Sequence, residues 1–171
     1  MKSRAAGDRM APMRVGIGYD VHRFGAERPL VLGGVEFPGE PGLIGHSDAD
    51  PVMHALADAV LGAAALGDLG DHFPDTSAEW KDADSARILS EALRLAAKER
   101  GLVPVNVDVN VIAEHPRLAE KKHAMRERLA RVLGLPIHSV SVKARTAEGL
   151  GPVGQGEAIE VHAAVLMEEA G

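Results

Sequence analysis

Hydrophobic and polar residues alternate along several segments of the chain, and this alternation predicts β-strands. The clearest segment is 103–111, where valine stands at every second position. Residues 14–22 (RVGIGYDVH) and 159–165 alternate in the same way, and 140–142 marks a shorter strand. Apolar residues at 30–32 and 35–37 flank Gly33-Gly34 and predict a hairpin. Because side chains at i and i+2 of a strand share a face, each long strand has one apolar face.

Other segments have helical periodicity. Residues 47–66 are apolar around nearly the whole circumference, which predicts a buried helix with Asp50 as its N-cap and Pro51 at its first position. Residues 82–100 and 117–134 predict two further helices, while 38–47 and 67–77 are loops by composition. This order of strands and helices predicts an α/β (α+β) two-layer sandwich, with helices on one face of a mixed sheet.

Asp20 and His22 lie two residues apart in the first alternating segment, so their side chains point to the same face. Gly16 and Gly18 lie on this face too, where the missing side chains leave room for a substrate or another backbone. The buried helix adds a third side chain of the metal-binding kind, His54. Two imidazoles and a carboxylate leave the fourth position of a tetrahedral zinc ion open, as in catalytic sites.

His54 and Asp58 interrupt the apolar helix, and their spacing of four residues puts them on one face. For a histidine taken alone, the simplest explanation is a hydrogen bond between His54 and Asp58 within the core. The presence of Asp20 and His22 instead favours a metal site with His54 as the third ligand. Asp58 is then expected to orient His54 through the second ring nitrogen.

The composition excludes several classes of protein. The chain of 171 residues is long enough for one domain with a core, in which aliphatic residues replace the scarce aromatics (3%). It has no cysteine, which excludes thiolate ligands, disulfides and cysteine nucleophiles. A net charge of -6 without a basic cluster argues against a nucleic-acid partner. Without a membrane-spanning run or a signal peptide, we expect a soluble cytoplasmic protein with no membrane partner.

Residues 1–12 (MKSRAAGDRMAP) show no periodicity, and we expect a disordered N-terminal extension there. Residues 13–171 contain no internal repeat, low-complexity tract or linker. They are therefore expected to form a single domain.

Longer motifs follow one another in a characteristic order: DVH at 20–22, GHSDAD at 45–50, HALADAVLGAAALGDLGDHFPDT at 54–76, ADS at 83–85, NVDVNVIAEHPRL at 106–118, VKARTAE at 142–148 and GQGEAI at 154–159. With these motifs the chain, from Met13 to about Glu168, closely resembles the 2-C-methyl-D-erythritol 2,4-cyclodiphosphate synthases. The resemblance implies a lyase of non-mevalonate isoprenoid biosynthesis that cyclises 4-diphosphocytidyl-2-C-methyl-D-erythritol 2-phosphate and releases CMP. It also implies a ferredoxin-like fold and a homotrimer with active sites between adjacent subunits.

Carried over by position, the resemblance implies zinc on Asp20, His22 and His54, the residues that the spacing also selects, and Mg²⁺ or Mn²⁺ on Glu148. It assigns catalytic roles to His46, Ser47, Thr146 and Glu148. The implied substrate-binding positions form a longer set: Asp20, His22, His46, Ser47, Asp68, Gly70, Phe73, Pro74, Asp75, Thr76, Ala113, Pro116, Arg117, Leu118, Lys143, Ala144, Arg145 and Thr146.

These positions divide by the part of the substrate that they are expected to hold. His46 and Ser47 donate to phosphate oxygens, residues 68–76 hold the methylerythritol hydroxyls, residues 113–118 read the cytosine, and residues 143–148 meet the diphosphate. Without the resemblance, Ser47 is an ordinary capping residue, and the other segments are a turn-rich loop and a chain reversal before a proline.

The chain departs from the family pattern at a few positions. Arg145 and Ala147 replace threonines that commonly flank the position of Thr146, and Ser77 replaces an aspartate. Gln155 stands where the family often has an arginine near a central cavity associated with isoprenoid diphosphates, so weak binding of such ligands is expected. Two other functions stay open from the residues alone: a zinc-dependent phosphohydrolase and a non-catalytic trimeric scaffold of the pathway.

Overall fold

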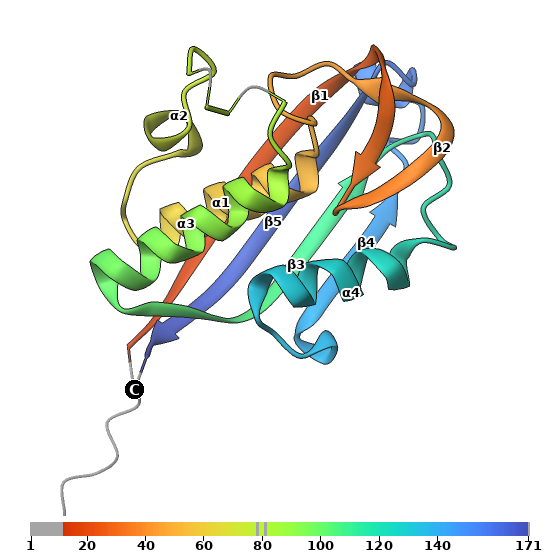
Figure 1. Cartoon of the computed structure of the whole chain (residues 1–171). Helices are drawn as coiled ribbons and strands as arrows, with labels where there is room; N and C mark the ends of the chain where they lie inside the picture. Colours follow the sequence, from red (N-terminus) through yellow and green to blue (C-terminus); the bar gives the residue numbers. More distant parts are fainter. Residues whose placement is uncertain (1–11, 78, 81, 171) are drawn as a thin grey trace, which may run out of the picture.

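The structure is a computed structural model that describes residues 12–77, 79–80 and 82–170. The predicted N-terminal extension, apart from Pro12, lies outside these residues. The chain forms, in order, β1 (Met13–Leu32), β2 (Val35–Leu43), α1 (Pro51–Ala63), α2 (Leu69–His72), α3 (Ser85–Arg100), β3 (Leu102–Ile112), α4 (Lys122–Leu133), a 3₁₀ turn (Ile137–Ser139), β4 (Val140–Arg145), α5 (Gly151–Gly154) and β5 (Ala158–Glu169) (Figure 1).

The strands form one mixed sheet in the order β2-β1-β5-β3-β4. β3 and β4 are parallel, and the other neighbouring pairs are antiparallel. Helices α1, α3 and α4 cover one face of this sheet (Figure 1). The predicted mixed sheet with helices on one face is therefore confirmed.

The predicted ferredoxin-like topology is wrong. A ferredoxin-like domain has the element order β-α-β-β-α-β, whereas here a helical crossover precedes β3, a second one precedes β4, and β5 follows with only the short α5 between. The crossovers make β1, β3 and β4 parallel to one another. β5 then fills the gap between β1 and β3 and is antiparallel to both.

The first two strands are longer than predicted. β1 continues past His22, and its second half pairs with β2 through the turn at Gly33 and Gly34, which confirms the predicted hairpin. The predicted loop 38–47 begins only after Leu43, where β2 ends. β2 accommodates its glycines and prolines because it is an edge strand whose pairing with β1 shifts register.

The starts of the helices depend on their capping residues. Asp50 caps α1 as predicted, accepting hydrogen bonds from the backbone N–H groups of Val52 and Met53. The same buried carboxylate accepts from Gly33 and Gly34, so it joins the hairpin turn to the start of α1. The helix predicted from 82 begins at 85, because Asp84 caps it, and the helix predicted from 117 begins only at 122.

α1 packs unusually closely on β1, at Gly16 and Gly18. A Cβ atom at Gly16 would overlap the carbonyl oxygen of Ala59, and a Cβ atom at Gly18 would overlap that of Ala55. Of the two explanations for these glycines, the approach of another backbone is the one that the structure shows. This contact brings the helix face that carries His54 close to Asp20.

The opposite face of β1 carries a row of exposed apolar side chains. Val15, Ile17, Tyr19 and Val21 alternate along the strand, and Ile17 is 77% exposed. Among the described residues, no strand neighbours the first half of β1 at its outer edge, because the pairing with β2 begins only at Phe24. We call this row the apolar row of β1.

Candidate metal centre and active site

Asp20 and His22 meet on the face of β1 that is turned toward α1. The Nε2 atom of His22 lies 3.0 Å from Oδ2 of Asp20. The other ring nitrogen of His22, Nδ1, lies 2.7 Å from the carbonyl oxygen of Ile44 and donates its proton there. This hydrogen bond leaves the Nε2 lone pair of neutral His22 free to bind a metal beside Asp20.

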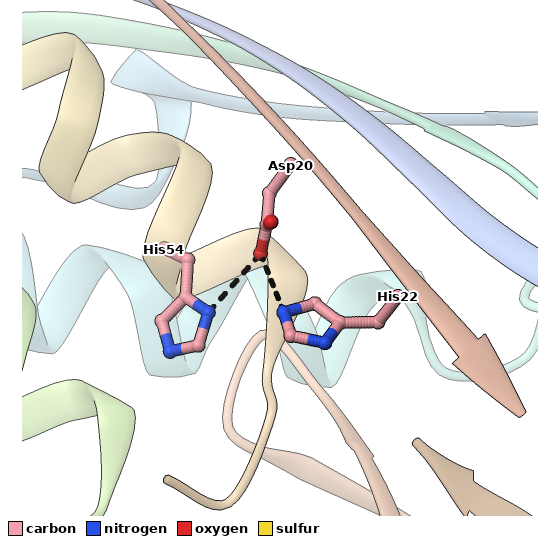
Figure 2. A group of neighbouring side chains, drawn as sticks. All are labelled: Asp20, His22 and His54. Atoms are coloured by element: carbon pink, nitrogen blue, oxygen red, sulfur yellow. Dashed lines mark hydrogen bonds and ion pairs between the residues drawn. The ribbon is translucent and has the colours of Figure 1, made fainter. Parts of the chain in front are cut away.

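His54 reaches the same point from α1. Its Nδ1 atom lies 3.1 Å from Oδ2 of Asp20, and Figure 2 shows both rings converging on this one carboxylate. One ligand atom from each of Asp20, His22 and His54 lies within 4.8 Å of the others. We call these residues the triad. As predicted from the spacing, a strand and a helix bring together two imidazoles and a carboxylate, which are side chains of the kind that bind metals.

The triad is electrostatically suited to a cation. Burial raises the pKa of the Asp20 carboxyl, but the hydrogen bonds and the charge attraction to His22 and His54 together outweigh burial and lower this pKa to about 2. Burial likewise lowers the pKa of His22, but the hydrogen bond and the charge attraction to Asp20, with the Ile44 carbonyl and the charge of Asp50, together raise this pKa above its usual value. Both pKa shifts show that positive charge is favourable next to the Asp20 carboxylate. A divalent ion would supply this positive charge in place of protons.

The predicted hydrogen bond between Asp58 and His54 does not form. Asp58 accepts instead from the backbone N–H of Leu69 at 3.1 Å. Both ring nitrogens of His54 face other partners, Asp20 on one side and the hydroxyls of Ser47 and Ser85 on the other. Asp58 therefore holds the start of α2, and it does not orient His54. The spacing of four along α1 was correct but did not show in which direction each side chain points.

A cavity of about 280 Å³ opens beside the triad. Its lining contains the predicted residues Asp20, His22, His46, Ser47, His54, Phe73 and Asp75, together with Leu69, Trp80 and Ile88. The predicted Asp68 and Gly70 line a neighbouring cavity that shares Asp20 and His54 with the first. Pro74 and Thr76 flank Asp75 in the chain but do not line these two cavities.

A separate cavity of about 330 Å³ lies where β3 and β4 end. It is lined by Ala113, Pro116, Arg117, Leu118, Ala144, Arg145 and Thr146, all of them predicted, and by Glu114 and Ala119. It shares no lining residue with the cavity beside the triad. Most of the predicted substrate-binding residues thus line cavities in two separate places, one beside the triad and one at the ends of β3 and β4.

Thr146 and Glu148 form a small unit next to the second cavity. The Thr146 hydroxyl donates to a carboxylate oxygen of Glu148 at 3.0 Å. Glu148 has a φ of 54°, a left-handed conformation that is uncommon for a residue other than glycine and that is often found at functional sites. Lys143 lies apart from this unit: its ammonium group donates to Asp108 at 2.5 Å on the open face of the sheet.

Sequence reasoning missed several residues of the site. Trp80 packs edge-to-face on Phe73, with ring centroids 4.9 Å apart, and closes one side of the cavity. Ser85 contacts His54 from the start of α3. Neither has a periodic signal that connects it to the triad; the only trace in the sequence is the ADS motif at 83–85.

The fold and the site define an α/β protein with a metal-type triad beside a cavity. Residues 13–168 match the model of the YgbB family, and the chain belongs to this family. The predicted family is thereby confirmed.

Curated relatives match nearly the whole chain. The 2-C-methyl-D-erythritol 2,4-cyclodiphosphate synthase of Nitrosococcus oceani is 54% identical over 92% of this chain and 99% of its own length. The synthase of the same name from Gloeobacter violaceus is 55% identical over 92% of this chain and 96% of its own length. The predicted synthase activity, that of a lyase, is confirmed at this level of similarity.

Solved structures agree with the fold. The bifunctional IspDF of Campylobacter jejuni matches with a TM-score of 0.89 and 40% identity over 94% of this chain, which spans 43% of that chain. A 2C-methyl-D-erythritol-2,4-cyclodiphosphate synthase bound to CDP matches with a TM-score of 0.82 and 36% identity, over 91% of this chain and 100% of that one. Within the part of the chain that the structure describes, no helix is long and apolar enough to cross a membrane.

Proposed function

We propose that the chain cyclises 4-diphosphocytidyl-2-C-methyl-D-erythritol 2-phosphate to 2-C-methyl-D-erythritol 2,4-cyclodiphosphate with release of CMP, a step of non-mevalonate isoprenoid biosynthesis. The observation that carries this proposal is the triad, which adjoins a cavity lined by His46, Ser47 and Asp75. These side chains can form hydrogen bonds with an anionic phosphate and with polyol hydroxyls. The names of the relatives support the same reaction.

The reaction forms one phosphorus–oxygen bond and breaks another. An oxygen of the 2-phosphate attacks the β-phosphorus of the diphosphate, and the bond from that phosphorus to the bridging oxygen breaks, so that CMP leaves with the bridging oxygen. The electron pair of the broken bond goes to CMP, and no protein nucleophile is needed. Charge repulsion and orientation are the barriers, and orientation within one bound molecule is worth about 7–11 kcal/mol at best.

Asp20, His22 and His54 would hold zinc, and Glu148 would hold Mg²⁺ or Mn²⁺ together with phosphate oxygens of the substrate. When bound, these ions supply polarisation of the β-phosphoryl oxygens and neutralisation of the charge on departing CMP. The hydroxyls of Ser47 and Thr146 donate hydrogen bonds to phosphate, Thr146 in place of its hydrogen bond to Glu148, and His46 stabilises the developing charge. The residues of the second cavity, Ala113 to Leu118, hold the cytosine.

A homotrimer completes this site. Within one chain, Asp20 and His22 of the triad lie on β1 and Thr146 follows β4, with β5 and β3 between them. Three strand spacings correspond to about 14 Å, so one chain cannot place both groups on the same diphosphate. The apolar row of β1 supplies a surface by which a neighbouring copy can pack and bring its own Thr146 and Glu148 to the triad. The weak binding of isoprenoid diphosphates that is expected from Gln155, which is exposed after α5, stays a prediction.

The test is ³¹P NMR of the purified protein with the cytidyl diphosphate substrate and Mg²⁺, before and after zinc is removed with a chelator. We expect CMP and two coupled cyclic-diphosphate resonances, both of which disappear on zinc removal and return when zinc is added. Linear phosphate products would instead identify a phosphohydrolase. Unchanged substrate in the metal-replete sample, with no difference between the wild type and His54→Ala, would identify a scaffold.

A further inference from the structure

His54 directs only one of its ring nitrogens to the metal centre. Nδ1 faces Asp20, whereas Nε2 points away from it toward two hydroxyls, Ser85 Oγ at 2.9 Å and Ser47 Oγ at 3.0 Å. Ser85 has no exposed surface, and Ser47 is 4% exposed. With almost no access to water, these polar atoms must satisfy one another. The direction of each hydrogen bond therefore determines which nitrogen of His54 carries a proton.

The hydroxyl proton of Ser85 is already used by another acceptor. Ser85 Oγ donates to one carboxylate oxygen of Asp48 in a short hydrogen bond, and the Ser85 backbone N–H donates to the other oxygen at 3.2 Å. An ionised carboxylate can only accept, and a hydroxyl has a single proton to donate. Ser85 Oγ can therefore meet His54 only as an acceptor, so Nε2 of His54 is the donor in this contact.

We propose that Ser85 and Asp48 are positioning residues that set the tautomer of His54. A relay runs from His54 Nε2–H to Ser85 Oγ–H and on to the Asp48 carboxylate. With the Nε2 proton held in this way, the Nδ1 lone pair is left for a metal that would replace the proton between Nδ1 and Asp20. Ser85 lines neither of the two cavities beside the triad and acts through His54 alone. This inference rests on the proposed metal site and names the residues that prepare one of its ligands.

The relay also joins the start of α3 to the loop that carries His46 and Ser47. The backbone N–H of Asp48 donates to the carbonyl oxygen of Ala83 at 3.1 Å, and that of Asp82 donates to the carbonyl oxygen of His46 at 2.9 Å. These contacts hold Asp48 in place beside Ser85. The position of the His54 ring and the position of the phosphate-facing loop therefore depend on the same few hydrogen bonds.

The first test compares the affinity for Zn²⁺ alone, measured by competition with a chromophoric chelator, in the wild type and in Ser85→Ala. We expect Ser85→Ala to weaken zinc binding about 10- to 100-fold, the usual effect of losing such an outer partner. Ser85→Thr keeps the hydroxyl and should restore most of the affinity. Ser90→Ala is the matched control: it lies on the same helix, its hydroxyl donates to the carbonyl oxygen of Ala86, and its loss should leave zinc binding unchanged.

Equal zinc affinities of Ser85→Ala and Ser90→Ala would overturn the relay while leaving the metal site intact. A wild type that binds no zinc would overturn both the relay and the proposed function. A second measurement does not require the variants to fold: long-range ¹H–¹⁵N NMR of the zinc-loaded wild type with labelled histidine. We expect zinc on Nδ1 of His54 and a slowly exchanging proton on Nε2 close to Ser85. Zinc on Nε2 would disprove the relay.

Discussion

Gly18 of β1 lies directly under the carbonyl oxygen of Ala55 of α1, so closely that a Cβ atom at position 18 would overlap that oxygen. Asp20 follows two residues later on the strand, and His54 precedes Ala55 on the helix. The distance between the metal-facing atoms of Asp20 and His54 is therefore set by the contact between the two backbones. A glycine with no chemistry of its own determines the geometry of the triad.

Gly18→Ala is expected to weaken both folding and metal binding. The new methyl group meets backbone atoms, which cannot rotate away, so α1 must shift outward at a cost of about 1–3 kcal/mol in the free energy of unfolding. Zinc affinity should fall together with stability, because His54 moves with the helix. Urea denaturation and a zinc titration would measure the two effects.

Gly62→Ala provides the control for this prediction. Gly62 lies in the same helix, and a Cβ atom there would be 3.8 Å from its nearest neighbour, the carbonyl oxygen of Ile17. Alanine is the better helix former, so this variant should gain about 0.5–1 kcal/mol and keep its zinc affinity. A Gly18→Ala protein as stable as Gly62→Ala would show that the close packing of α1 on β1 is not required.

The metal-free protein should lose stability at both ends of the pH range. The pKa of Asp20 is lowered to about 2 in the folded state, so its contribution is present above pH 4 and is lost as the pH falls toward 2, by roughly 2 kcal/mol. The pKa of His22 is raised, so its contribution is present at low pH and is lost as the pH rises through that raised value. Unfolding curves of chelator-treated protein against pH would measure both changes.

Zinc binding should follow the opposite trend on the alkaline side. A metal ligand must be deprotonated, so zinc affinity should rise through the same pH range in which the metal-free protein loses the contribution of His22. Asp20→Asn is the informative variant, because it removes both the carboxyl group that titrates at low pH and the negative charge that raises the pKa of His22. If its acid unfolding were as steep as that of the wild type, Asp20 would not be the titrating group.

The metal ligands could be predicted from the sequence because their positions follow from local periodicity. The i, i+2 spacing of Asp20 and His22 determines a shared strand face, and the cap at Asp50 determines where the helix that carries His54 begins. The partners that a side chain contacts on other elements were not predictable in this way. Asp58 shares a helix face with His54 but turns to Leu69, and Ser85 reaches His54 from the start of another helix. The course of β5 between β1 and β3 was missed for the same reason: strand order depends on crossovers that no local pattern records.

Glu148→Gln is expected to raise the Mg²⁺ concentration needed for half-maximal turnover. Glutamine keeps the size of the side chain and can still accept a hydrogen bond from Thr146, but it lacks the charge that attracts a divalent cation. Losing one charged contact costs about 1.5–3 kcal/mol, which corresponds to about tenfold or more in apparent Mg²⁺ affinity. Zinc affinity should not change, because Glu148 takes no part in the triad.

Glu157→Gln, at an exposed position, is the control for the loss of one negative charge. If both variants had the same Mg²⁺ dependence as the wild type, Glu148 would not be the magnesium ligand.

Ile17→Glu tests whether a second copy completes the active site. Ile17 is the most exposed member of the apolar row of β1, and its side chain points away from α1 and the triad. A charge there should prevent another copy from packing on this face, because a buried carboxylate without a partner is costly. We expect light scattering coupled to size exclusion to show a monomer in place of a trimer, and CMP release to fall at least a hundredfold. The zinc affinity of each chain should stay near that of the wild type, since Asp20, His22 and His54 belong to one chain.

The control is Lys98→Glu, on the exposed surface of α3, which should leave both assembly and turnover unchanged. A monomeric Ile17→Glu protein with full activity would refute the shared site, because one chain would then bring the triad and Glu148 to the same diphosphate without a neighbour.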